Sequence, residues 1–302
     1  MYGRRDVLRA SAALGLLAAS PWLRADTQGA MLTRKVPSSG EPLPVIGAGT
    51  SGSFEVSAGS AQYQQLKVAL KAFFEGGGTV IDTSPNYGGA DAILGQLLEE
   101  GGWHRQCFIA TKIAADSPDA ARRQWAESLK SLRTDKVDLL QIHNLRDWKT
   151  QLPYARELKQ QGKTRYVGIT HYLASGHADV IDIVRREPLD FVQINYSVNS
   201  PQAARELLPL CQEKGVGVLI NRAFDDGRLF AKVKDQPLPA WAAEVGVSSW
   251  AQTFLKFAIS HPAVTCVIPA TGRPDRQLDQ LKAGVGPLLS EAQQKALIEQ
   301  FA

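Results

Sequence analysis

The chain has 302 residues, with 34 Lys and Arg against 30 Asp and Glu, a formal net charge of +4 and 44% hydrophobic residues. This length and composition are typical of one large globular domain. The sequence has no Lys/Arg run with interleaved aromatic residues, and its apolar stretches are too short to cross a bilayer. These features argue against nucleic-acid-binding and membrane-spanning proteins.

The first 26 residues are predicted to be a signal peptide. Residues 3–9 contain the paired arginines Arg4 and Arg5, an apolar run follows over residues 10–19, and residues 23–25 are a loose match to a small-residue cleavage site. The paired arginines resemble the twin-arginine (Tat) export signal, which handles proteins that are already folded. The alternative is an ordinary basic N-terminal helix.

An export signal has consequences for charge, partners and location. Without residues 1–25 the chain carries 30 basic and 29 acidic residues, so the basic excess belongs to the leader. We expect the export machinery as a partner of the precursor and a periplasmic protein with no stable membrane anchor after cleavage. If the signal is not functional, the protein is cytoplasmic. Residues 27–302 form the remaining domain.

The three cysteines, Cys107, Cys211 and Cys266, lie far apart in apolar or helical stretches. They have no metal-ligand spacing and cannot all pair. We expect each to be a buried free thiol, and we expect no metal site.

Eight short apolar runs alternate with amphipathic segments along residues 27–302. The predicted strands are 44–47, 79–81, 107–111, 137–142, 166–169, 191–194, 217–220 and 265–268. The predicted helices are 62–75, 90–100, 118–132, 154–161, 174–186, 201–214, 248–259 and 274–282. Short β-branched strands that are each followed by a helix indicate parallel strands buried on both faces. Eight such units predict an eight-fold parallel β/α (TIM) barrel, and an open doubly wound sheet is the alternative.

Polar residues stand where three consecutive predicted strands end. Asp82 follows the second strand, and Tyr87 lies on the glycine-flanked turn after it. Lys112 ends the third strand, and His143 follows the fourth. Each of these residues taken alone is more often structural than catalytic. If the strands are neighbours in a barrel, however, the four side chains converge at one rim, where barrel active sites form.

The four residue types support proton transfer to a carbonyl oxygen. An ammonium at Lys112 is expected to lower the pKa of Tyr87, and Asp82 to hold Lys112. Tyr87 would then donate a proton, and His143 would hydrogen-bond the carbonyl oxygen. Because no good nucleophile is present, a bound hydride donor best completes the chemistry. A lyase that uses Lys112 as a Schiff base is the weaker alternative, since Asp82 would keep the amine charged.

These residues and the sequence around them resemble the aldo/keto reductase family. The family's Asp, Tyr, Lys and His tetrad matches Asp82, Tyr87, Lys112 and His143, and the similarity runs from about residue 46 to residue 281. The resemblance implies a barrel enzyme that reduces an aldehyde or ketone, a small carbonyl substrate, to an alcohol. It implies NADPH as the cofactor, with NADH possible. A runner-up function is an NADP(H)-binding accessory or sensor protein with little turnover.

The resemblance also implies a set of cofactor-binding residues. Asn144 and Gln193 match positions that hold the nicotinamide carboxamide, and the usual Ser-Asn pair on the fifth strand is Thr170-His171 here. Asn221 and Arg222 match positions beside the nicotinamide and the pyrophosphate. Thr271 and Gly272 match the phosphate-binding segment, and Gln280 matches a position that contacts the adenine. Arg273 or Arg276 is expected to pair with a 2′-phosphate, which favours NADPH.

Two further features stand near the predicted barrel mouth. Residues 47–52 spell G-x-G-x-x-G after a strand, but a loop-like segment follows where a Rossmann site requires a helix. Gly49 and Thr50 are therefore expected to line the cofactor cleft. Trp148, predicted to lie in the loop after the fourth strand, is a candidate substrate contact, although such an aromatic residue covers a barrel mouth about as often.

Overall fold

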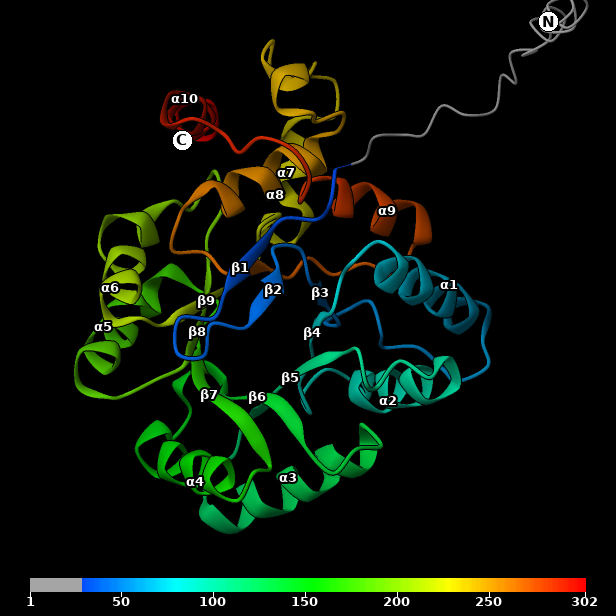
Figure 1. The fold of residues 1–302 in the computed structure, drawn as a ribbon, viewed down its shortest axis with the longest axis vertical. Coiled ribbons are helices and arrows are strands. Elements are labelled where there is room, and N and C mark those ends of the chain that lie inside the picture. Colours follow the sequence, from blue (N-terminus) through cyan, green and yellow to red (C-terminus); the bar gives the residue numbers. More distant parts are fainter. Residues whose placement is uncertain (1–28) are drawn as a thin grey trace, which may run out of the picture.

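Eight parallel strands form one sheet that closes into a barrel (Figure 1). The first of them lies at Ala48–Gly49 and not at the predicted residues 44–47. The computed structural model describes residues 29–302, so the expected signal peptide lies outside the described part. The sheet consists of β3 (Ala48–Gly49), β4 (Val80–Asp82), β5 (Phe108–Ile113), β6 (Val137–Ile142), β7 (Thr164–Thr170), β8 (Phe191–Asn195), β9 (Gly217–Asn221) and β10 (Cys266–Val267). The strands pair in chain order, and the bridges Ile46–Val267 and Gly49–Ala270 join the two edges. The predicted barrel is therefore confirmed.

Helices surround the barrel on its outer face (Figure 1). They are α1 (Ala61–Glu75), α2 (Ala90–Gly101), α3 (Pro118–Ser131), α4 (Trp148–Gln160), α5 (His177–Arg186), α6 (Leu207–Lys214), α7 (Arg228–Lys232), α8 (Trp250–Ser260), α9 (Pro274–Lys282) and α10 (Glu291–Phe301). The side-chain oxygens of Ser60, Ser117, Ser249 and Ser290 cap α1, α3, α8 and α10 by accepting a backbone N–H.

Three helices differ from their predicted bounds. The predicted helix 174–186 is divided into a 3₁₀ turn over Ala174–Gly176 and α5. Helix α4 begins at Trp148, six residues before the predicted start, because Pro153 lies inside the helix and does not mark its beginning. The predicted helix 201–214 is divided into a short 3₁₀ turn over Gln202–Arg205 and α6. Glu206, with φ −143° and ψ −49°, leaves the helical region between them.

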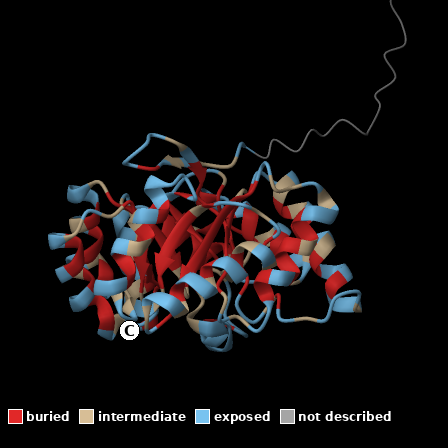
Figure 2. Cartoon of the chain, turned by 90° about the horizontal axis from the view of Figure 1, so that it is seen from below, coloured by how far each residue is buried: buried red, intermediate tan, exposed pale blue. Residues whose placement is uncertain are grey.

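Buried residues lie on the barrel strands and on the helices around them (Figure 2). They form two clusters. A large cluster packs the outer face of the strands against the helices, and a smaller one fills the barrel interior. The interior cluster includes Phe108, Tyr166 and Phe191, whose rings contact one another with centroids 5.4–6.2 Å apart. The interior is therefore a packed core, and a ligand can bind only at an end of the barrel.

A short hairpin closes the end of the barrel at which the strands begin. Strands β1 (Thr33–Lys35) and β2 (Pro42–Pro44) pair antiparallel, and Val36 and Leu43 enter the interior cluster. Glu41 beside β2 accepts hydrogen bonds from Arg165 and from the Tyr166 hydroxyl, the latter at 2.6 Å. The sequence did not predict this hairpin, because its strands have only three residues each.

The cysteines are buried and free, as predicted. Within residues 29–302 no helix is long and apolar enough to span a membrane. The same residues contain no group of three His, Cys, Asp or Glu side chains arranged to hold a metal ion.

Candidate active site

Asp82, Tyr87, Lys112 and His143 come together where the strands end. Asp82 is the last residue of β4, Lys112 lies near the end of β5, and His143 directly follows β6. Pairing of β4 with β5 and of β5 with β6 brings these strand ends side by side. Gly88 and Gly89, with φ of 49° and 85°, turn the chain after Tyr87 into α2.

Lys112 and Asp82 form a buried ion pair. Lys112 Nζ lies 2.6 Å from Asp82 Oδ1 and donates a second hydrogen bond to the Thr83 carbonyl oxygen at 2.7 Å. Lys112 is only 1% exposed. Burial lowers the pKa of Lys112, but the Asp82 charge and the groups around the ammonium outweigh it, so the net pKa lies above its ordinary value. Lys112 is therefore charged at neutral pH, which disfavours the Schiff-base alternative.

Tyr87 lies against this ion pair. Its ring centroid is 5.0 Å from Lys112 Nζ and 5.8 Å from the His143 ring, which meets it edge-on at 81°. Burial raises the pKa of Tyr87 more than the Lys112 charge lowers it, so the net shift is upward. Lys112 therefore lowers the pKa of Tyr87 as expected, but burial outweighs this effect and the pKa does not fall below its ordinary value. The phenol is fully protonated at neutral pH, which suits a proton donor.

His143 is neutral at this site. Burial, with a smaller contribution from the Lys112 charge, lowers the pKa of His143 to about 3. Its Nδ1 lies 3.2 Å from Ser84 Oγ, and that oxygen already accepts a hydrogen bond from the Asn86 backbone N–H at 3.3 Å. The Ser84 hydroxyl can therefore donate to Nδ1, which leaves the proton on Nε2. Ser84 was not among the predicted site residues.

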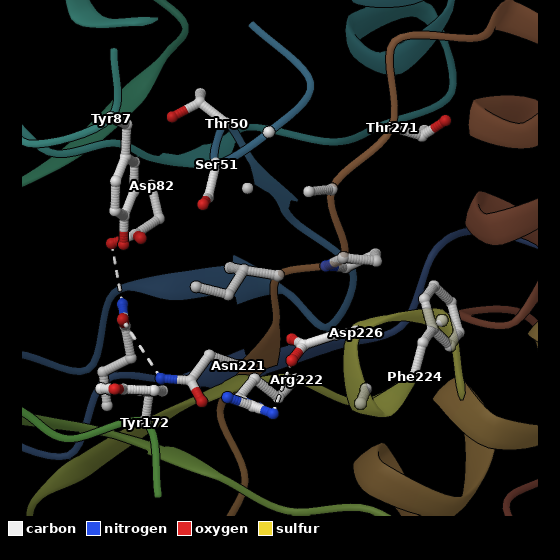
Figure 3. A pocket seen from close by; sticks show the side chains of 18 of the residues that line it. Thr50, Ser51, Asp82, Tyr87, Tyr172, Asn221, Arg222, Phe224, Asp226 and Thr271 are labelled. Atoms are coloured by element: carbon white, nitrogen blue, oxygen red, sulfur yellow. Dashed lines mark hydrogen bonds and ion pairs between the residues drawn. The ribbon is translucent and has the colours of Figure 1, made fainter. Parts of the chain in front are cut away.

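A directional chain of hydrogen bonds leads from Asp82 to Asn221. Because a carboxylate only accepts, Gln193 turns its amide nitrogen to Asp82 Oδ2 at 2.8 Å. The Gln193 oxygen then accepts from the Thr170 hydroxyl at 3.2 Å and from Asn221 Nδ2 at 3.5 Å. The Asn221 oxygen is left without a partner among the described residues. In Figure 3, dashed lines trace this chain between the labelled Asp82 and Asn221.

Gln193 and Asn221 both belong to this chain of hydrogen bonds. The resemblance implies that Gln193 contacts the nicotinamide carboxamide, and the structure uses one N–H bond and the oxygen of its amide for protein groups. Asn221, at the end of β9, also has an acceptor oxygen without a partner among the described residues. Gln141 adds a second amide donor to Asp82 Oδ2 at 3.1 Å.

A cavity of about 1140 Å³ opens beside these residues. Most predicted site residues line it, namely Gly49, Thr50, Asp82, Tyr87, His143, Asn144, Gln193, Asn221, Arg222, Thr271, Arg276 and Gln280. Lys112 lies behind this surface, beneath Tyr87. Gly49–Gly52 also border the cavity, and α1 begins only at Ala61, so no helix opens there as a Rossmann site requires.

Besides Lys112, three predicted residues do not line the cavity. They are Gly272, Arg273 and Trp148. Arg273 forms two hydrogen bonds to Asp275, at 3.1 and 2.7 Å, so its guanidinium is already paired. Trp148 is the first residue of α4 and packs against the outer core, so its expected place in a substrate-facing loop is wrong.

The cavity suits a long dinucleotide. Two unpartnered amide oxygens belong to residues of its wall, Asn221 Oδ1 beside the tetrad and Gln280 Oε1 on α9. Buried acceptors of this kind indicate that a ligand supplies N–H donors. Arg276, near the first turn of α9, also lines the cavity, and it forms no ion pair within residues 29–302. A cation at a helix N-terminus fits a phosphate.

Sequence analysis missed several cavity residues. Ser51, Asn86, Tyr172, Asp226 and Phe230 all line the wall. They follow β3, β4, β7 and β9, Phe230 within α7, and only the rule that a barrel site forms where its strands end could have found them.

The chain is similar in sequence to known proteins of one family. The model of the aldo/keto reductase family matches residues 45–300. L-galactose dehydrogenase from Arabidopsis thaliana is 30% identical over 225 residues, which are 69% of this chain and 69% of that protein. The NADH-specific methylglyoxal reductase of Escherichia coli (strain K12) is 27% identical over 195 residues, 54% of this chain and 57% of that protein, so the match spans little more than half of that relative.

Solved structures show the same architecture. An aldo-keto reductase from Klebsiella pneumoniae in complex with NADPH superposes with a TM-score of 0.75 at 25% identity, covering 90% of this chain and 96% of that one. A second Klebsiella pneumoniae structure, in complex with NADP and acetate, gives a TM-score of 0.73 at 25% identity and covers 87% of this chain and 93% of that one. The resemblance inferred from the tetrad is therefore confirmed, and the chain belongs to the aldo/keto reductase family.

Proposed function

We propose that this protein reduces an aldehyde or ketone to an alcohol with NADPH, and that Tyr87 donates the proton. The family membership and the NADPH-bound Klebsiella neighbour support an NAD(P)H-dependent oxidoreductase. The observation that carries the proposal is the position of the Tyr87 phenol, which lies against the buried Lys112–Asp82 pair and beside the His143 ring.

The chemistry balances with these groups. When bound, the reduced nicotinamide supplies the hydrogen and two electrons that pass to the carbonyl carbon, and NADP⁺ remains. Tyr87 gives its proton to the carbonyl oxygen, and the charged Lys112 stabilises the phenolate that forms. Nε2–H of His143 donates a hydrogen bond to the same oxygen and orients it. Solvent then returns a proton to Tyr87.

The cofactor would lie along the cavity between the tetrad and α9. Asn144 and Asn221 would hold the nicotinamide carboxamide, and Thr271 and Arg276 the phosphate end. Gln280, whose amide oxygen has no partner among the described residues, would accept a hydrogen bond from the adenine amino group.

An aldehyde panel with the purified protein tests the proposal. We expect carbonyl-dependent consumption of NADPH with stoichiometric alcohol formation. Tight NADPH binding without turnover of any aldehyde or ketone would instead identify the accessory or sensor protein. Absence of NADPH binding would refute both functions.

We also propose that the precursor is exported in folded form. The support is the sequence alone, with Arg4 and Arg5 placed before a short apolar run. Replacing both arginines by Lys should leave uncleaved, active protein in the cytoplasm on fractionation. If the Lys-Lys form reaches the periplasm as efficiently as the original, the segment is not a twin-arginine signal.

A further inference from the structure

The cavity wall near the tetrad carries polar side chains that the protein itself does not use. Ser51, Asn86 and Tyr172 line the cavity together with Tyr87 and His143. Within residues 29–302 the hydroxyls of Ser51 and Tyr172 and the side-chain amide of Asn86 have no hydrogen-bond partner; the bond of Asn86 to Ser84 comes from its backbone. These groups offer both donors and acceptors to whatever occupies this part of the cavity.

The three side chains come from three separate loops. Ser51 follows β3, Asn86 lies between β4 and α2, and Tyr172 follows β7. The Tyr172 ring, although 43% exposed, contacts two protein groups. Its centroid is 5.4 Å from Arg222 Cζ and 5.9 Å from the His171 ring, which stacks on it at 16°. The phenol of Tyr172 is therefore held at the cavity edge (Figure 3).

The charges nearby are already neutralised. Arg222 lines the cavity, but its guanidinium lies 2.6 Å from Asp226 and 3.5 Å from Asp225. Lys112 is paired with Asp82. This end of the cavity therefore offers no unpaired cation among the described residues to bind a carboxylate or phosphate on the substrate.

Phe224 and Phe230 form an aromatic part of the wall. In Figure 3, Phe224 stands on the opposite side of the cavity from Tyr87. Phe224 packs against Phe230, with ring centroids 5.0 Å apart. Trp148, the aromatic residue expected to contact substrate, does not line the cavity.

We propose that the substrate is a small, uncharged, hydroxylated aldehyde or ketone whose hydroxyl groups are bound by Ser51, Asn86 and Tyr172. This proposal rests on the carbonyl reduction proposed above. When hydroxyls of the substrate replace water at these three side chains, hydrogen bonds to the side chains are kept, so little free energy is lost. An apolar substrate of the same size strips water from them without replacing its hydrogen bonds, and sites built to bond a hydroxyl discriminate strongly against analogues that lack it.

A matched substrate series tests the proposal. We would measure kcat/KM with NADPH for D-glyceraldehyde, butanal and succinic semialdehyde, each corrected for its unhydrated fraction. D-glyceraldehyde should exceed the other two by about tenfold or more. Equal or faster reduction of butanal or succinic semialdehyde overturns the substrate class while leaving carbonyl reduction intact. No turnover of any carbonyl refutes the proposed function instead.

Variants test the residues themselves. Asn86→Leu and Tyr172→Phe should each lower the ratio of kcat/KM for D-glyceraldehyde to that for butanal by about three- to tenfold, since each removes one hydrogen-bonding group. The NADPH dissociation constant and the melting temperature should not change. Gln64→Leu, on the exposed face of α1 outside the cavity, is the matched control and should keep the ratio. An unchanged ratio in both Asn86→Leu and Tyr172→Phe rules out recognition by these side chains.

Discussion

The side-chain amide of Gln193 donates a hydrogen bond to Asp82 Oδ2 at 2.8 Å, while Asp82 Oδ1 accepts from Lys112 at 2.6 Å. The Asp82 carboxylate thus accepts hydrogen bonds both from the Lys112 ammonium beneath Tyr87 and from the Gln193 amide on β8. Because Asp82 only accepts, it determines which way the Gln193 amide faces, and Gln193 in turn determines the orientation of Asn221. The residue that keeps Lys112 charged therefore also directs a free oxygen toward the expected nicotinamide.

Asn221→Ala should remove a contact to the carboxamide amino group. The measurement compares the dissociation constant of NADPH with that of its 3-acetylpyridine analogue, in which a methyl group replaces this amino group. The unaltered protein should prefer NADPH by about tenfold, because the analogue leaves the buried Asn221 oxygen without a donor. In Asn221→Ala the two constants should be nearly equal.

Gln280→Ala is the control for this comparison. Its amide oxygen is also unpartnered in the cavity wall, but it lies on α9, away from the tetrad. The Gln280→Ala variant should bind NADPH and its analogue more weakly to the same extent, so the ratio of the two dissociation constants should not change. A preference for NADPH that survives in Asn221→Ala would show that another residue binds the amino group.

Tyr87→Phe should abolish reduction and leave cofactor binding within a few-fold. Loss of a general acid typically costs about 100- to 10,000-fold in rate, whereas the phenyl ring can keep its packing against Lys112 and His143. Single-turnover kinetics and NADPH titration measure the two effects. Turnover equal to that of the unaltered protein would remove Tyr87 from the mechanism.

Arg276→Ala should weaken NADPH binding more than NADH binding. Arg276 lines the cavity, and a charge-assisted contact to the 2′-phosphate is typically worth about 1.5–3 kcal/mol. Arg273→Ala is the matched control, because Arg273 is exposed and paired with Asp275. It should change neither affinity by more than about twofold. The assignment is wrong if Arg273→Ala, and not Arg276→Ala, removes the preference for NADPH.

The pH profile of reduction should contain no step from His143. Its pKa is lowered to about 3, so the imidazole stays neutral from about pH 5 upward, and protonation near pH 6.5 does not occur in the folded protein. The pKa values of Tyr87 and Lys112 are both raised, so activity should fall only above about pH 10, when the proton donor ionises. A step in kcat/KM near pH 6.5 that disappears in His143→Gln would contradict this description of the site.

The sequence by itself determined the barrel and the tetrad. Eight apolar β-branched runs, each followed by an amphipathic segment, can bury both strand faces only in a helix-covered parallel sheet. Asp82, Lys112 and His143 stand at the ends of consecutive strands, so their convergence follows from parallel pairing in chain order. The sequence pattern is sufficient for these features because each strand end can be located from the residues around it and the strands pair in chain order.

Only the tertiary structure decided how these residues are used. Burial raises the pKa of Tyr87 although Lys112 lies beside it, and burial depends on every element packed around the ring. The engagement of Gln193, the pairing of Arg273 with Asp275 and the place of Trp148 on α4 depend on side-chain directions that spacing does not encode. The polar wall of Ser51, Asn86 and Tyr172 is likewise assembled from three loops that are brought together only when the barrel closes.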